Sequence, residues 1–249
     1  CPMTEQGPQD VDFQKVYDEI HKEKKNATLD KSNNYEVVPS QNTISFDVKE
    51  AQSQYDACEL GGEIEIPLSV EEPEVTTEKL KSNLFTTELA SYSTTGGGSE
   101  GRRTNISLAV KSCNGVILLP GETFSYNDTL GERTADKGYQ PAGAYSDGEV
   151  VEQLGGGICQ VSSTLFAAVL HTDLEIVTRA NHSMPVSYLP MGMDATVSWG
   201  GPEFKFKNNF SYPIKISASY SGGTINFKIL GAASDKKKIE VEVKKTGEM

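Results

Sequence analysis

The first third of the chain alternates apolar and charged positions in a way that is typical of a small α/β module. Residues 11–24 place Val11, Val16 and Ile20 near helical spacing among charged residues, which predicts an amphipathic surface helix. Asp47 is a candidate N-cap for a second helix over residues 47–60, which we expect Gly61 and Gly62 to close. Three short strands are predicted at "YEVVP", "NTISF" and "EIEIPLSV". Together these elements predict a module of about 80 residues, within the usual size of a domain.

A change in composition marks the end of this module. The acidic stretch "EEPEVTTEKL" predicts a linker, and residues 91–103, "SYSTTGGGSEGRR", are rich in Ser, Thr and Gly and predict a mobile loop. We therefore expect two domains, residues 1–83 and residues 84–249.

The second domain has mostly strand-like patterning. A short helix is predicted over residues 102–115, an extended segment over 115–127 and a hairpin around "DG" within 140–154. Further strands are predicted at "LEIVTRA", "DATVSW", "EFKFKN", "YPIKISASY", "TINFKIL" and in the charged tail "SDKKKIEVEV". One helix beginning near Ile158, "ICQVSSTLFAAVL", is apolar on most faces, which predicts a buried position. The predicted fold class is α+β: a small α/β module, then a sheet-rich α+β domain with a buried central helix.

The charge balance narrows the possible partners. The chain has 23 Lys and Arg against 35 Asp and Glu, a formal net charge of -12, which disfavours binding to nucleic acid or to anionic lipid. No apolar run approaches the roughly 20 residues that span a bilayer, so we expect no direct membrane insertion. The chain begins at Cys1 rather than at methionine, which leaves open a signal or anchor upstream.

The four cysteines form neither a CxxC pair nor a dense disulfide framework. Neither a zinc ribbon nor a disulfide-stabilised small domain is therefore indicated. A bridge between Cys1 and Cys58 and two free thiols both remain open.

Cys159 is the candidate nucleophile. At the start of the buried helix its thiolate would be favoured by the helix dipole and by backbone N–H groups, which could also stabilise an oxyanion near Gln160. Gly155, Gly156 and Gly157 would allow a sharp turn and leave room for substrate beside the sulfur. A buried thiol that only packs in the core is an equally open reading of the local pattern.

Helical geometry separates the three histidines as partners for this cysteine. His171 lies further along the same helix, about 18 Å away at 1.5 Å per residue, so it cannot reach Cys159. His21 belongs to a charged surface helix and is most simply solvated. His182, at the end of a predicted strand and beside Ser183, remains as the candidate base, although a lone histidine is often structural. Asp194 could orient its imidazole or simply form a turn.

Arginines supply the candidate contacts for an anionic substrate. Arg103, Arg133 and Arg179 could each hold a carboxylate in a bidentate pair, or could form ordinary surface ion pairs. Ser183 is a further candidate substrate contact. No ligand pair has the short spacing of zinc motifs, so we expect neither a metal nor any other cofactor.

Several sequence blocks, taken in order, resemble the VanW domain of bacterial cell-envelope proteins. They span about residues 102–231 and are "RRTNISLAV", "NGVILLPGETFSYNDTLGERTADKGYQPAGAY", "GGGICQVSSTLF", "RANHSMPVSY", "GMDATV" and "FKFKNN". Most of residues 8–80 is similar, on fewer fixed positions, to the peptidoglycan-binding module that often precedes such domains.

The resemblance implies an extracellular, wall-associated protein of a Gram-positive type bacterium, anchored by an upstream transmembrane helix. It implies an L,D-transpeptidase that forms 3-3 cross-links between peptidoglycan stem peptides through a thioester, with Cys159 as nucleophile and His182 as base. Asp194 would orient His182. Two alternatives stay open: an L,D-carboxypeptidase that uses the same cysteine, and a non-catalytic peptidoglycan-binding or scaffolding protein. The oligomeric state is left undetermined.

Overall fold

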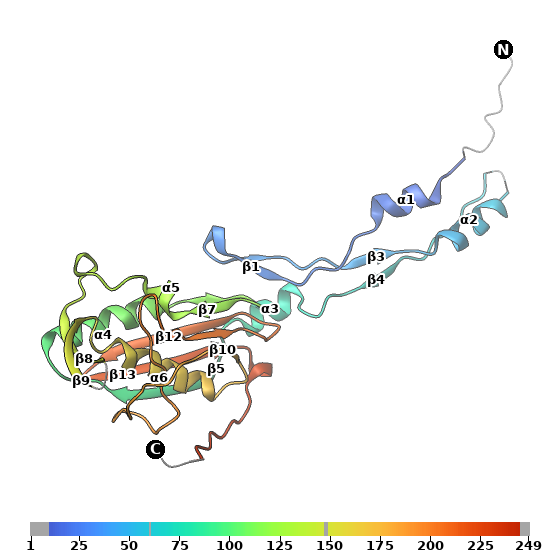
Figure 1. The fold of residues 1–249 in the computed structure, drawn as a ribbon. Coiled ribbons are helices and arrows are strands. Elements are labelled where there is room, and N and C mark those ends of the chain that lie inside the picture. The colour runs from blue at the N-terminus through green and yellow to red at the C-terminus, as the bar shows by residue number, and fades with distance from the viewer. Residues whose placement is uncertain (1–9, 60, 147–148, 245–249) are drawn as a thin grey trace. The chain divides into compact units, whose positions relative to one another are not determined.

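The computed structural model describes residues 10–59, 61–146 and 149–244, and it has a mixed α+β fold (Figure 1). Every strand pairing in these residues is antiparallel. The chain divides into two compact units, Cys1–Lys81 and Ser82–Met249, here called the first and the second unit. The fold class agrees with the sequence prediction.

Two short helices build the core of the first unit. Helix α1 (Phe13–Ile20) and helix α2 (Val48–Asp56) pack around the buried side chains of Phe13, Phe46 and Ala51. The Asp47 side chain accepts hydrogen bonds from two backbone N–H groups of the first turn of α2, which confirms the predicted N-cap. Helix α2 ends at Asp56, earlier than the glycines expected to close it.

The strands of the first unit are short and form two separate pairs. Strand β1 (Thr28–Asp30) pairs with β2 (Glu36–Val38), and β3 (Thr43–Ser45) pairs with β4 (Ser69–Glu71). The predicted strand over residues 63–70 thus forms only at its end. Helix α3 (Thr77–Asn83) crosses the boundary between the units.

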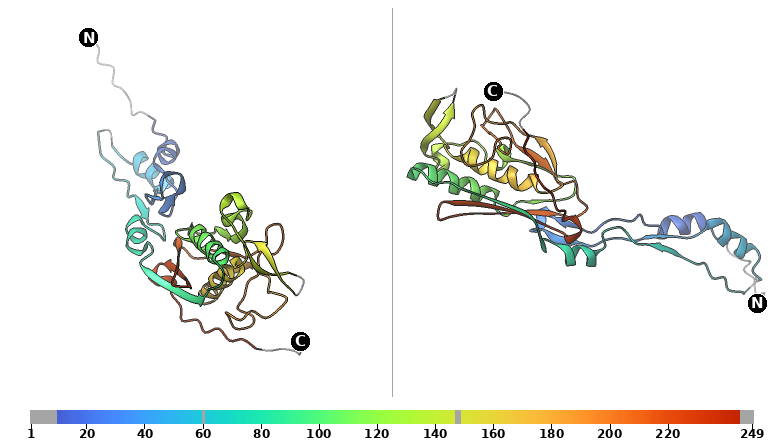
Figure 2. Two further views of the ribbon diagram at one scale, coloured as in Figure 1. Left: turned by 90° about the vertical axis from the view of Figure 1, so that its left-hand side faces the viewer. Right: turned by 90° about the horizontal axis from the view of Figure 1, so that it is seen from below.

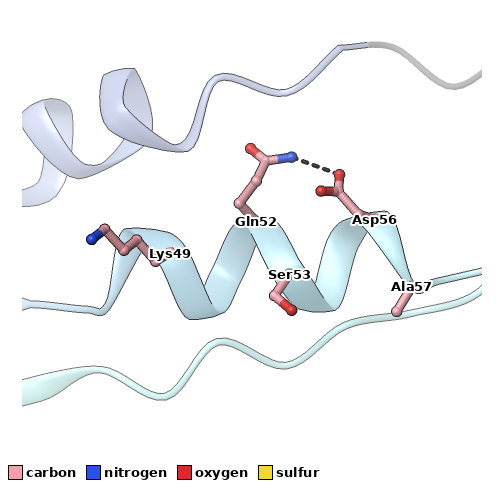
Figure 3. Close-up of a pocket in the computed structure, with 5 residues that line it drawn as sticks. All are labelled: Lys49, Gln52, Ser53, Asp56 and Ala57. Carbon is pink, nitrogen blue, oxygen red and sulfur yellow. Dashed lines mark hydrogen bonds between the residues drawn. The ribbon is translucent and has the colours of Figure 1, made fainter.

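An open hollow lies along α2 in the first unit (Figure 3). It is lined by Lys49, Gln52, Ser53, Asp56 and Ala57. The Gln52 amide donates to the Asp56 carboxylate at 2.8 Å, one turn later.

A four-stranded antiparallel sheet is the base of the second unit. Its order is β5 (Thr87–Thr95), β13 (Thr224–Gly231), β12 (Ile214–Ser221) and β6 (Ile117–Leu118). Strand β13 alternates buried and more exposed residues, with Ile225, Phe227 and Ile229 fully buried. This alternation provides one apolar face for helices to cover.

Helices α4 (Glu100–Cys113) and α6 (Ile158–Leu170) lie together on that face (Figure 2). A second antiparallel sheet has the strand order β10 (Glu175–Thr178), β11 (Lys205–Lys207) and β7 (Thr123–Ser125). Aromatic core residues beside this sheet reach α6. The rings of Phe166 in α6 and Phe204, next to β11, meet edge to face at 5.4 Å. Because α6 has packed neighbours on several sides, most of its residues are buried, as its apolar pattern predicts.

A short helix and a hairpin precede α6 in the second unit. Helix α5 (Tyr126–Leu130) follows β7, where the sequence predicts only an extended segment. The predicted hairpin is formed by β8 (Pro141–Ser146) and β9 (Glu149–Leu154), and its expected "DG" turn lies outside the described residues. Among the described residues, no helix combines the length and apolar character that crossing a membrane requires.

Three sequence predictions in the second unit are wrong. Residues 91–103 are not one loop, because β5 pairs with β13 as far as Thr95 and Ser99 caps α4. Residues 194–199 form no strand, since the Ala195 backbone bonds serine side chains of α6 and the Thr196 and Ser198 N–H groups donate to carbonyl oxygens outside any strand. The tail forms no strand within the described residues either.

Leu165 lies at the centre of this core and is fully buried in α6. We expect Leu165→Ala to lower the free energy of unfolding of the second unit by about 2–5 kcal/mol, because it leaves a cavity. Urea unfolding followed by the fluorescence of Trp199, the single tryptophan, would measure this. Val177→Ala, at a side chain that is 47% exposed, is the control and should change stability by less than about 0.5 kcal/mol. Equal losses in both variants would contradict the central position of α6.

Candidate active site

Cys159 lies in the first turn of α6, directly after the Gly157 N-cap and Ile158. Its side chain is partly buried, and its Sγ lies 3.4 Å from the Val197 carbonyl oxygen and 3.8 Å from the Thr196 hydroxyl. The sulfur therefore faces the irregular segment at residues 194–199.

The glycine turn before Cys159 is fixed by close packing. Gly155 and Gly157 have φ values of +85° and +105°, which favour glycine. A Cβ on Gly156 would lie 2.4 Å from the carbonyl oxygen of Ala142 in β8. Gly156 therefore allows close contact between the turn and the hairpin. The sequence pattern predicts a different use for this glycine, as room for substrate beside the sulfur.

Asn105 of α4 holds the same turn from the other direction. Its Nδ2 donates to the carbonyl oxygens of Gly156 at 3.0 Å and Gln140 at 2.9 Å, and its Oδ1 accepts from the Gln140 N–H at 2.8 Å. Asn105 is fully buried, so these bonds satisfy a polar group that has no access to water. The position of Cys159 is thus set by α4 and β8 as well as by its own helix.

The Cys159 N–H is an available backbone donor at the start of α6. The N–H groups of Ile158 and Gln160 donate to the carbonyl oxygens of Gly155 and Gly157, both at 3.1 Å. The Cys159 N–H has no such acceptor within the described part of the chain. Because first-turn N–H groups point out of the helix N-terminus, this donor is placed to bind an oxyanion beside Sγ.

His182 and Asp194 form a close pair. The His182 Nδ1 lies 2.6 Å from Asp194 Oδ2, and the His182 backbone N–H donates to the same oxygen at 2.7 Å. His182 and Cys159 line the same pocket and interact closely enough to shift each other's pKa, and with Nδ1 engaged by Asp194, Nε2 is the ring nitrogen left for the sulfur. The three predicted side chains are therefore brought together at one place.

The charges of these three side chains support one another. Burial opposes the thiolate of Cys159, but the interactions with His182, Val197 and Thr196 together outweigh it and lower the pKa of the thiol. Burial also opposes the imidazolium, yet hydrogen bonds to Asp194 and Cys159 raise the pKa of His182 to about 9. For Asp194, burial is likewise outweighed by hydrogen bonds from His182, and the pKa of the carboxyl is lowered. The arrangement favours a thiolate–imidazolium pair at neutral pH.

Arg179 holds Asp194 instead of facing the pocket. Its Nη2 lies 3.0 Å from Asp194 Oδ1, and its Nε donates to the Asp194 carbonyl oxygen at 2.7 Å. Its guanidinium carbon lies 5.2 Å from the ring centroid of Phe166, within the range of a cation–π contact. Arg179 is thus placed to position the carboxylate of Asp194. The sequence predicts instead that Arg179 contacts substrate, and this prediction is wrong.

Two serines of α6 fix the segment that carries Asp194. Ser162 Oγ donates to the Ala195 carbonyl oxygen at 2.6 Å, and Ser163 Oγ accepts from the Ala195 N–H at 3.0 Å. Ser163 Oγ also donates to the Cys159 carbonyl oxygen at 2.6 Å. Both serines are fully buried, so α6 itself sets the separation between Cys159 and the residues that bind His182.

A pocket of about 690 Å³ opens beside Cys159. The residues that line it include Arg102, Glu132, Arg133, Leu154, Gly155, Gly156, Gly157, Cys159, Gln160, His182, Tyr188 and Trp199. Trp199 and Leu154 are 51% and 44% exposed and add apolar surface to the lining. The pocket therefore combines Cys159 and His182, the candidate nucleophile and base, with both cationic and apolar groups.

The other side chains predicted to contact substrate include Arg133, Gln160 and Ser183, and the structure places each of these three differently. Arg133 lines the pocket but is largely buried, and it donates to Asn127 and Gly131. The buried amide of Gln160 donates to Thr95 and accepts from Arg102, so its side chain is occupied within the protein. Ser183 is exposed and does not line the pocket.

The other two histidines lie elsewhere. His171 caps the far end of α6, where its Nδ1 lies 2.7 Å from the Ala167 carbonyl oxygen. His21, expected to be solvated, stacks on Tyr17 at 4.8 Å and lies 2.9 Å from the Ile44 carbonyl oxygen. Of the described residues, no three His, Cys, Asp or Glu side chains gather as metal ligands would. Cys58 carries a free thiol, and Cys1 lies outside the described residues.

Sequence reasoning missed Arg102, Asn105 and the two serines. Arg102 stands at the end of a stretch whose glycines and serines predict a loop, and nothing local distinguishes it from Arg103. Three polar residues in a row, Ser162, Ser163 and Thr164, within an apolar helix were the available signal, because buried hydroxyls need partners.

We expect Gly156→Ala to disrupt the start of α6. The new Cβ would meet backbone atoms of Ala142 and Gly143 at 2.4–2.8 Å, and backbone cannot move aside as a flexible side chain can. The melting temperature should fall by several degrees, and alkylation of Cys159 by iodoacetamide should change. Gly97→Ala is the matched control, since a Cβ there has nothing within 4 Å. Identical melting and alkylation in the two variants would contradict the described turn.

The pH dependence of alkylation tests the Cys159–His182 pair. In a Cys58→Ala background, the rate of alkylation should rise with pH through the lowered pKa of Cys159. His182→Gln removes the stabilising imidazolium, so the pKa of the thiol should rise and the rate at pH 7 should fall at least about tenfold, or one pKa unit. Rate measurements between pH 5 and 10 would show the shift, with His171→Gln as control. An unshifted profile in His182→Gln would rule out the pair.

Comparison with known proteins adds an independent line of argument. The family model described as VanW like protein matches residues 101–230. The uncharacterized protein YoaR of Bacillus subtilis (strain 168) is 46% identical over 163 residues, 65% of this chain and 54% of the relative. The vancomycin B-type resistance protein VanW of Enterococcus faecalis (strain ATCC 700802 / V583) is 35% identical over 135 residues, 51% of this chain and 49% of the relative.

The chain spans about half the length of the curated relatives it matches. No solved structure gives a significant match. The matched region begins in α4, ends in β13 and includes Cys159, His182 and Asp194. Since the family model covers more than half of its residues, the chain belongs to the VanW-like family.

Proposed function

We propose that the second unit is a cysteine-dependent L,D-transpeptidase that acts on peptidoglycan stem peptides. The observation that carries the proposal is the meeting of Cys159 with the hydrogen-bonded pair of His182 and Asp194 beside an open pocket. This is the arrangement of a thiol enzyme that transfers acyl groups. A relative named as a vancomycin resistance protein supports a role in the cell wall.

Acylation begins with the thiolate of Cys159. It attacks the carbonyl carbon of the third, L-configured residue of a stem tetrapeptide, and the C–S bond forms as negative charge develops on oxygen. The Cys159 N–H donates to this oxygen. His182 then gives its proton to the amine of the terminal D-alanine, the C–N bond breaks, and a thioester remains.

Deacylation transfers the acyl group to a second stem peptide. A side-chain amine of the acceptor attacks the thioester, His182 takes a proton from that amine, and the C–S bond breaks to restore the thiolate. Asp194 keeps the imidazole oriented in both steps and stabilises its protonated form. If water replaced the amine, the same residues would perform an L,D-carboxypeptidase reaction.

The proposal also assigns roles to the surrounding residues. Gly155 to Gly157 shape the floor beside the sulfur, and Arg133 supplies positive charge for a substrate carboxylate. Arg179 and Gln160 are positioning residues, which act through Asp194 and Arg102 respectively. Ser183 is exposed beside His182 and lies outside the pocket lining. It would contact the acceptor stem peptide there.

We propose a location in the cell envelope, outside the membrane, with anchoring by a segment upstream of this chain. Residues 1–83 would act as a peptidoglycan-binding module that keeps the second unit near its polymeric substrate. Tethering of this kind raises the effective concentration of substrate without adding contacts at the active site.

Incubation with a disaccharide-tetrapeptide, followed by mass spectrometry, tests the proposal. The unaltered protein should release D-alanine and form a cross-linked dimer, while Cys159→Ala should lose at least about 1,000-fold in rate because the nucleophile is absent. Cys58→Ala is the matched control and should retain activity.

The products separate the alternatives. A shortened tripeptide without dimer would identify a carboxypeptidase. Equal dimer from the unaltered protein and Cys159→Ala would rule out the nucleophile. Binding to intact peptidoglycan without any turnover would favour the scaffolding role instead.

A further inference from the structure

The pocket beside Cys159 has a charge opposite to that of the whole chain. The chain has a formal net charge of -12, yet the residues that line the pocket include Arg102, Arg133 and His182. The carboxylate among the lining residues is Glu132, which is exposed. In an acidic protein, such a concentration of cationic groups at a nucleophile favours an anionic ligand.

Arg102 is held in the pocket by neutral acceptors. Its Nε donates to the Gly97 carbonyl oxygen at 3.0 Å, and its Nη2 donates to Gln160 Oε1 at 2.7 Å. A Cβ built on Gly157 would lie 3.2 Å from Nη1, so this third nitrogen lies over the turn that precedes Cys159. Within the described residues Arg102 has no ion pair, so the two bonds orient the guanidinium but leave its charge uncompensated.

Arg133 is a second guanidinium of the pocket lining, only 8% exposed, and its guanidinium carbon lies 6.0 Å from the ring centroid of Tyr126. Its Nη1 and Nη2 donate to the Gly131 carbonyl oxygen at 2.9 Å and Asn127 Oδ1 at 2.6 Å, while its Nε is buried without a partner. No carboxylate of the described residues forms an ion pair with it. A buried charge of this kind is costly unless a ligand of opposite charge completes its surroundings.

We propose that Arg102 and Arg133 make the pocket selective for an acyl donor with free carboxylates, and that Arg102 binds one of them directly through its Nη1 side. The inference rests on the proposed function and specifies its donor as an anionic peptide, in which amidation of the carboxylates weakens recognition. Guanidinium suits this role because it forms charge-assisted hydrogen bonds with carboxylate oxygens.

The alternative is that Arg102 acts only through Gln160, next to the nucleophile. Charge selectivity distinguishes the two roles, since a purely structural residue would alter reactions with neutral and anionic reagents equally. The alkylating reagents iodoacetate and iodoacetamide provide this comparison, because both react with a thiolate and differ in charge.

The first experiment measures the ratio of the alkylation rates of Cys159 by iodoacetate and by iodoacetamide. In a Cys58→Ala background, Arg102→Met should lower this ratio at least about fivefold, because a nearby cation is lost. Arg103→Met is the control, since Arg103 is the next residue of α4, is exposed and does not line the pocket. It should leave the ratio within about twofold, as expected for a screened surface charge.

Arg102→Lys covers the case in which Arg102→Met fails to fold. Lysine keeps the charge but loses the planar fork, so its ratio should lie between those of the unaltered protein and Arg102→Met. A ratio that is unchanged in both variants, or lowered equally by Arg103→Met, would overturn the inference.

The second experiment compares tetrapeptide donors whose carboxylates are free or amidated. The unaltered protein should prefer the free acids in kcat/KM by at least about tenfold, and Arg102→Met should reduce that preference. Turnover with no preference would overturn the inference and leave the transpeptidase proposal intact. A changed alkylation ratio without any turnover would support the anionic site and count against the transpeptidase.

Discussion

The bonds from Ser162 and Ser163 to Ala195 are the constraint on which the rest of the site depends. They fix an irregular segment against a buried helix, and that segment carries Asp194 immediately before the contact and Val197 shortly after it. Val197 accepts from the sulfur, and Asp194 holds His182. Because the hydroxyls are fully buried, any separation of the segment from α6 would leave polar groups without partners. The positions of Cys159 and His182 are therefore set by the fold itself.

Burial has two opposing effects at this centre. It disfavours each of the charged forms of Cys159, His182 and Asp194 taken singly, but it also strengthens their mutual attraction. The balance favours the charged forms of all three groups, because each side chain interacts with the next one. The pKa of the Cys159 thiol is lowered in this site, whereas the pKa of Cys113, a fully buried thiol of the described residues, is raised by burial.

Local sequence signals identify the helix at Cys159 and the choice of histidine, because both follow from short-range rules. Glycines before an apolar run mark a helix start, and the rise per residue removes His171. The same rules could not separate Arg179 from Arg133, since the difference is which carboxylate lies nearby after folding. They also misread residues 194–199 as a strand, because an alternating pattern says nothing of partners on a distant helix. Arg102 was missed because its glycine-rich surroundings hide the start of α4.

The contact of Arg179 with the ring of Phe166 links the acid of the site to the apolar interior. Phe166 packs edge to face against Phe204, which belongs to the core of the second unit. One guanidinium therefore contacts both an aromatic ring of the core and the carboxylate that bonds the imidazole. A core substitution that preserves volume but tilts the Phe166 ring is accordingly expected to alter the setting of His182 while leaving the fold intact.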